Sequence, residues 1–153
     1  MIRFLQCLVV SCSFLVLAGL GIAMAHDNEG PLKVTTLVKS TDAWDGKPLP
    51  SYPKGQPEIT ILRIIIPAGE RTPLHIHPVI NAGVLLRGEL DVHMENGKHL
   101  KMNAGDSLIE VVDKPHWGQN NGRVDAEIVV FYAGVKGESL TEKLDEHDHP
   151  IKP

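Results

Sequence analysis

Residues 69–88 read GERTPLHIHPVINAGVLLRG and place His75 and His77 two positions apart between flanking glycines. In an extended strand, residues i and i+2 point to the same side, so both imidazoles can be directed at one point. A later stretch, residues 105–120, reads GDSLIEVVDKPHWGQN and contributes a third histidine, His116. Neutral imidazole is the commonest metal-binding side chain, and three such nitrogens leave coordination positions open for water or substrate. The pattern therefore predicts a metal site formed by three histidines.

Short runs rich in β-branched residues alternate with Gly, Asn and Pro from residue 58 onward. No segment shows a sustained helical period, and Asn96-Gly97 is typical of a hairpin turn. Regular short strands with turns between them indicate an all-β antiparallel sandwich or barrel. We expect strands at residues 59–66, 74–77, 83–87, 89–94, 99–102, 107–112 and 127–132.

The two histidine-bearing stretches together resemble the two motifs of the cupin superfamily. The first cupin motif is a glycine, five residues, His-x-His, three or four residues, a glutamate, six residues and a glycine. Residues 69–88 fit every spacing, but Asn81 stands where the family has glutamate. Residues 105–120 keep the glycine, histidine and asparagine of the second motif, whereas Val111 and Asp113 replace its proline and inner glycine. The chain thus resembles a small, three-histidine cupin without the motif-one glutamate.

This resemblance implies a single-domain jelly-roll (cupin) β-barrel, with both histidine-bearing segments on its inner wall. It implies one divalent transition metal held by His75, His77 and His116. Three histidines suit Fe, Zn, Cu, Ni, Co and Mn, so the ligand set does not name the metal. Family members with three histidines include Fe(II) dioxygenases, and the family also leads us to expect a homodimer.

Two residues near the histidines are candidates for catalysis. Asn81 shares the parity of His75, so its amide is expected to face the metal and to hydrogen-bond water or substrate. Glu110 shares the parity of apolar Leu108, and a carboxylate on an apolar face is costly unless it is paired or bound to metal. Glu110 is therefore a candidate fourth ligand or general base. The alternative is that it points to solvent, because Val111 on the opposite parity is apolar too.

Other polar and aromatic side chains carry weaker expectations. Arg63 either meets a substrate carboxylate inside the barrel or pairs with a carboxylate at its rim, and the rim is the commoner arrangement. Trp117 and Tyr132 either wall a pocket or pack in the core. His93 and His99 are expected on the outer face, because they alternate with apolar neighbours.

Residues 1–25 have the features of a secretory signal peptide. Arg3 precedes a long apolar run, which ends at Ala23-Met24-Ala25, a small-x-small cleavage site. A retained transmembrane anchor is the alternative. Cleavage would remove Cys7 and Cys12, leaving about 128 residues without a thiol, enough for one domain, and would send the protein to the periplasm.

The rest of the chain divides into three segments. Residues 26–57 form an irregular lead-in with an edge strand expected at 32–38, residues 58–133 form the barrel, and residues 134–153 form a charged tail, frayed or weakly helical. Without Arg3 the chain has 14 basic and 19 acidic residues, a formal charge of −5, and no basic stripe. Nucleic acid is therefore not an expected partner, and a small molecule is.

Two functions follow from these features. The first is an exported metal-dependent dioxygenase acting on a small organic substrate, with Asn81 or Glu110 orienting or deprotonating it. The second is a periplasmic cupin that binds or senses a metal or small ligand without turnover. Whether Glu110 faces the metal separates the two, since it is the carboxylate base that the enzyme hypothesis needs.

Overall fold

The computed structural model describes residues 32–145 and residue 149. The expected signal peptide, residues 1–25, lies outside these residues. The chain divides into two compact units, Met1–Val34 and Thr35–Pro153, and the barrel belongs entirely to the second. Within the described residues, no helix has the length and apolar character needed to cross a membrane.

All regular structure in the described residues is β-strand. The strands are β1 (Pro57–Ile66), β2 (His75–Ile76), β3 (Ile80–Arg87), β4 (Glu89–Met94), β5 (His99–Asn103), β6 (Ser107–Ile109), β7 (His116–Gln119), β8 (Ala126–Val135) and β9 (Glu142–Lys143).

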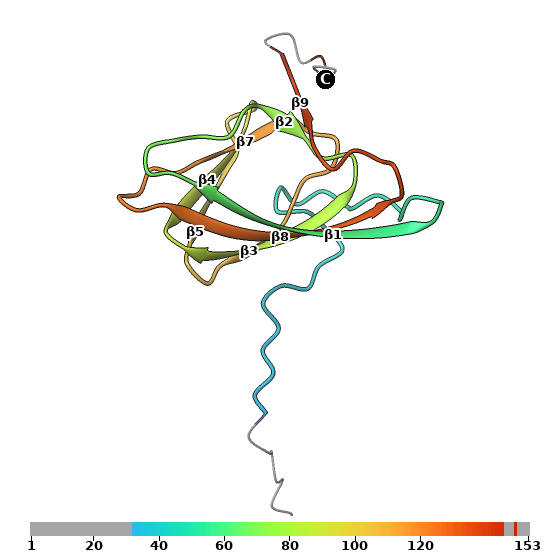
Figure 1. Cartoon of the computed structure of the whole chain (residues 1–153), viewed down its shortest axis with the longest axis horizontal. Coiled ribbons are helices and arrows are strands. Elements are labelled where there is room, and N and C mark those ends of the chain that lie inside the picture. Colours follow the sequence, from blue (N-terminus) through green and yellow to red (C-terminus); the bar gives the residue numbers. More distant parts are fainter. Residues whose placement is uncertain (1–31, 146–148, 150–153) are drawn as a thin grey trace, which may run out of the picture. The chain divides into compact units, whose positions relative to one another are not determined.

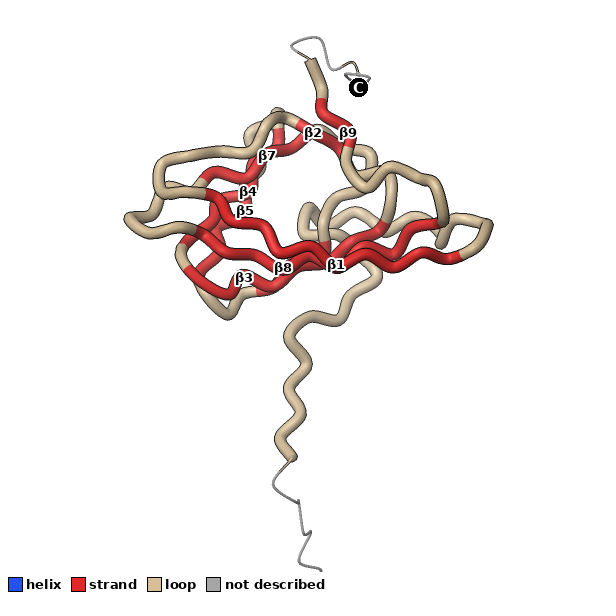
Figure 2. Tube along the Cα trace, in the orientation of Figure 1, coloured by secondary structure: helices blue, strands red, loops and turns tan. Residues whose placement is uncertain are grey.

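The strands form two antiparallel sheets. One has the order β1-β8-β3-β6 and the other β5-β4-β7-β2-β9. Strands β1 and β8, far apart in the sequence, pair along their whole length (Figure 1). Figure 2 shows the two sheets facing each other across the barrel interior, with β9 beside β2. The expected all-β jelly roll is confirmed.

The barrel interior is filled by alternate residues of the facing strands. In β4, Leu90, Val92 and Met94 are buried, whereas His93 between them is only partly buried. In β8 every second side chain, including Ile128, is buried in the same way. The period-two pattern expected for residues 89–94 is therefore confirmed.

Two expectations about the ends of the barrel were wrong. Residues 32–38 form no strand, and Leu32 and Val34 are 81% and 82% exposed, because no sheet edge pairs with this segment. The tail is not frayed or helical through residue 145: Glu142–Lys143 forms β9 and pairs with β2. Backbone pairing to a distant strand, together with burial of Leu144, holds this polar segment extended.

Candidate metal centre

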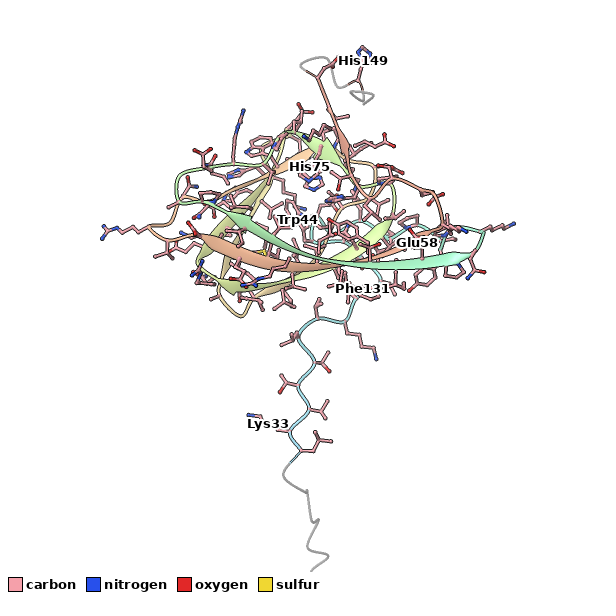
Figure 3. The ribbon with its side chains drawn as sticks, viewed as in Figure 1. Lys33, Trp44, Glu58, His75, Phe131 and His149 are labelled. Atoms are coloured by element: carbon pink, nitrogen blue, oxygen red, sulfur yellow. The ribbon has the colours of Figure 1, made fainter. Side chains whose placement is uncertain are left out.

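The three predicted histidines lie together between the sheets. His75 and His116 are directly opposite each other on β2 and β7, and His77 follows on the same side of the chain. The ring centroids are 4.3 Å apart for His75 and His116, 4.8 Å for His75 and His77, and 5.0 Å for His77 and His116. One nitrogen from each ring lies within 4.8 Å of the others. Figure 3 shows His75 directed into the interior, toward Trp44.

Backbone carbonyls set the orientation and the tautomer of all three rings. Each Nδ1 lies 2.8 Å from a carbonyl oxygen, and these carbonyls belong to Pro73 for His75, Leu140 for His77 and Lys114 for His116. A carbonyl oxygen only accepts, so each Nδ1 carries the proton and donates it. Each neutral ring then keeps its lone pair on Nε2, which is the arrangement of metal-binding histidines.

Burial keeps the three imidazoles neutral. It lowers the pKa of His75, His77 and His116 below the usual value, and the neighbouring imidazoles lower the pKa of His75 and His77 further. For His77 the pKa falls to about 3. Neutral imidazole is the form that coordinates a metal, so the site is ready for one at neutral pH.

Glu110 is buried beside the histidines. Its Oε2 lies 3.8 Å from Nε2 of His116 and accepts a hydrogen bond of 3.3 Å from Nε1 of Trp44. Burial raises the pKa of Glu110 to about 7. The alternative that this side chain points to solvent is therefore wrong. Strand β6 ends at Ile109, so the strict alternation that made Glu110 ambiguous stops one residue before it.

Asn81 also lies at the site, as its parity predicted. It is 1% exposed on β3, and its Nδ2 donates to the carbonyl of Val79 at 3.3 Å. Its Oδ1 and Nε2 of His116 are the two buried side-chain atoms, among the described residues, that lack a hydrogen-bond partner. Buried polar groups are normally paired, so these two atoms call for a ligand. The three Nε2 lone pairs and the adjacent carboxylate fit a divalent transition metal.

The second motif reaches His116 through a turn with an unusual backbone. Asp113 occupies the position where the family pattern has glycine, and its φ is +54°. Asp is among the few residues that tolerate this left-handed region, which explains how the chain keeps the turn without glycine. The amide of Asp113 donates to the carbonyl of His77 at 2.9 Å, so the turn ties the two histidine-bearing segments together.

The histidines lie at the polar end of a cavity of about 190 Å³. Its other walls are apolar side chains of β1, β4 and β8, and the size suits a small organic molecule. The lining residues that the argument uses are His75, His77, Asn81, Glu110, His116 and Lys143.

The remaining candidates divide between the cavity and the surface. Tyr132 lines the cavity, with its ring centroid 5.4 Å from that of His77. Trp117 faces outward and stacks on His93 at 5.3 Å. Arg63 is exposed and pairs with Glu127 at 2.8 Å, which is the rim arrangement.

Trp44 was not predicted at the site. It lies in the lead-in loop, whose amide donates from Trp44 to the carbonyl of Ile109 at 2.9 Å, and the adjacent Asp45 pairs with Lys114 at 2.5 Å. These contacts bring the indole to Glu110 from 66 residues away. No local pattern signals such a contact, because it depends on tertiary packing alone.

Comparison with known proteins agrees with the fold. Residues 62–132 match the family described as Cupin domain, and the chain belongs to the cupin superfamily through this domain. No curated protein matches the chain.

Two solved structures illustrate the likeness. The oxalate decarboxylase–formate complex of Lactobacillus farciminis is 19% identical with a TM-score of 0.50, over 56% of this chain and 26% of that one. The DMSP lyase DddQ of Ruegeria pomeroyi DSS-3 is 21% identical with a TM-score of 0.50, over 69% of this chain and 49% of that one. This chain thus spans about a quarter of the decarboxylase and about half of the lyase, and the likeness is one of fold.

Proposed function

We propose that this cupin binds one divalent transition metal through Nε2 of His75, His77 and His116 and acts on a small organic substrate as a dioxygenase-type enzyme. The observation that carries the proposal is the tautomer: all three Nδ1 atoms donate to backbone carbonyls, which leaves all three Nε2 lone pairs at one point. Such second-sphere hydrogen bonds typically orient metal-bound histidines.

A bound metal would act as a Lewis acid and, if it is iron, would support dioxygen chemistry. The chain's own groups have distinct roles in this proposal. Glu110 compensates positive charge beside His116 and, with a pKa raised to about 7, takes a proton from the substrate near neutral pH. The unpaired Oδ1 of Asn81 accepts a hydrogen bond from substrate or water. The apolar walls exclude bulk water from these groups.

The alternative function is binding or sensing of a metal or small ligand without turnover. The position of Glu110 favours the enzyme, because a buried carboxylate lies within 3.8 Å of a histidine nitrogen and can act as a base. The proposal also places the mature protein in the periplasm, on the strength of the signal-peptide features in residues 1–25.

The test is the metal content and oxygen consumption of untagged protein purified from its own export compartment. We expect one equivalent of iron and substrate-dependent oxygen uptake with a member of a diketone, thiol or flavonol panel. In the variant Glu110→Gln, oxygen uptake should fall while the iron is retained or only weakened. Stoichiometric zinc or copper without oxygen uptake would overturn the enzyme proposal and favour the binding function.

A further inference from the structure

Lys143 belongs to the same row of residues as two of the histidines. On the edge strand β9 it is directly opposite His75, which is in turn directly opposite His116 on β7. Directly opposed residues of neighbouring antiparallel strands point to the same side of the sheet. Lys143 therefore faces the cavity with the histidines, whereas Glu142, opposite Ile76, faces away.

Several contacts fix the segment that carries Lys143. The carbonyl of Leu140 accepts the Nδ1–H of His77, and Oγ1 of Thr141 lies 3.2 Å from the same nitrogen. The amide of Leu144 donates to the carbonyl of Leu74 at 3.0 Å, and the Leu144 side chain is buried. The backbone on both sides of Lys143 is thus attached to the histidine-bearing strand, which holds the ammonium group at the cavity.

The cavity presents this ammonium group with little to neutralise it. Lys143 is the one cationic side chain among the described residues that line the cavity, and it forms no ion pair with a described residue. The imidazoles beside it are neutral, and the other walls are largely apolar. A cation at the entrance of an apolar cavity attracts a molecule with an anionic group and an apolar body.

We propose that Lys143 is a specificity-determining residue that binds the carboxylate of a small substrate whose apolar part enters the cavity. This inference rests on the proposed function, since it assigns the substrate class of the same site. The Lys143 ammonium pairs with the carboxylate as a point charge, on the side of His75 away from His116. The cavity of about 190 Å³ limits the apolar part to roughly one ring or a short branched chain.

The experiment measures the affinity of zinc-loaded protein for benzoate and for benzamide by calorimetry. The two probes have the same shape and differ in charge, and zinc does not turn them over. Lys143→Met removes the charge and keeps the length of the side chain. Lys143→Arg keeps the charge, and Glu142→Gln alters a charge on the neighbouring residue that faces away. Zinc stoichiometry and thermal unfolding are recorded for every variant.

Wild-type protein should prefer benzoate to benzamide, and Lys143→Met should reduce this preference by about tenfold. Lys143→Arg and Glu142→Gln should keep it. An unchanged preference in Lys143→Met, or equal binding of the two probes by wild-type protein, would overturn the inference. If zinc does not bind at all, the proposed function fails instead. The same titrations of metal-free protein then test Lys143 alone, with the same expected loss.

Discussion

Replacing Glu110 by Gln should make the metal-free protein less sensitive to pH. Burial raises the pKa of Glu110 from 4.5 to about 7, so the folded state holds its proton over a range in which the unfolded state has lost it. Below pH 4.5 the carboxyl is protonated in both states and costs nothing. Between pH 4.5 and 7 folding has to retain a proton, so stability falls as pH rises, and above pH 7 the penalty is constant.

The shift corresponds to about 3 kcal/mol in full and to about 2.5 kcal/mol between pH 5 and pH 8. Glutamine has nearly the same shape and no charge, so this penalty disappears in the variant. The lowered pKa values of His75, His77 and His116 act in the opposite direction, because stability is lost as pH falls below their usual value. These histidines are present in both proteins, and their contribution largely cancels in the difference.

The assay is urea unfolding at pH 5 and pH 8 in the presence of a chelator. Relative to wild type, Glu110→Gln should gain about 2.5 kcal/mol on going from pH 5 to pH 8. Glu95→Gln, which removes an exposed carboxylate in the β4–β5 turn, sets the variation expected from surface charge. A difference between wild type and Glu110→Gln that does not change with pH would refute the assignment of Glu110 as a carboxyl held in a desolvated site.

Three further substitutions test the surroundings of the site and the turns by their effect on the free energy of unfolding in urea. Trp44→Phe should cost about 1 kcal/mol at pH 8, because it removes the donor to Glu110 and keeps the ring, and no loss would show that this hydrogen bond does not matter. Gly88→Ala should cost about 2 kcal/mol more than Gly97→Ala. Both glycines have positive φ, but a Cβ at Gly88 would lie 2.8 Å from a backbone oxygen while one at Gly97 meets nothing within 4 Å, so equal costs would contradict the packing. Asp113→Gly should stabilise the protein by about 0.5 kcal/mol, since glycine relieves the positive φ at that turn, and a clear loss would mean that the aspartate side chain supports the turn.

The sequence alone predicted the parts of the fold that depend on local pattern. Alternation at residues 89–94 placed Leu90, Val92 and His93 on the correct faces, because one face of β4 is buried and the other is not. The spacing of His75, His77 and His116 predicted their convergence, because a His-x-His pair on a strand has a fixed geometry. Asn81 was placed correctly for the same reason.

Features that depend on tertiary contacts were ambiguous or missed. Glu110 had two readings, since Leu108 and Val111 are both buried and alternation fails where β6 ends. Trp44 reaches the site from a loop, and Lys143 from a tail whose polar composition conceals a strand. In each case a partner far along the chain determines the position, and that information is absent from the local sequence.

The metal content of the chain tests the central claim most directly. Untagged wild-type protein, the double variant His75→Ala/His77→Ala and the matched double variant His93→Ala/His99→Ala would be loaded with zinc, dialysed and analysed for bound metal. The control removes two histidines that stack on each other, 5.7 Å apart, on the outer face of β4 and β5. We expect one equivalent of zinc in wild type and control, and none in a still folded His75→Ala/His77→Ala protein. Full occupancy in that variant, or no zinc in wild type, would contradict the proposed metal centre.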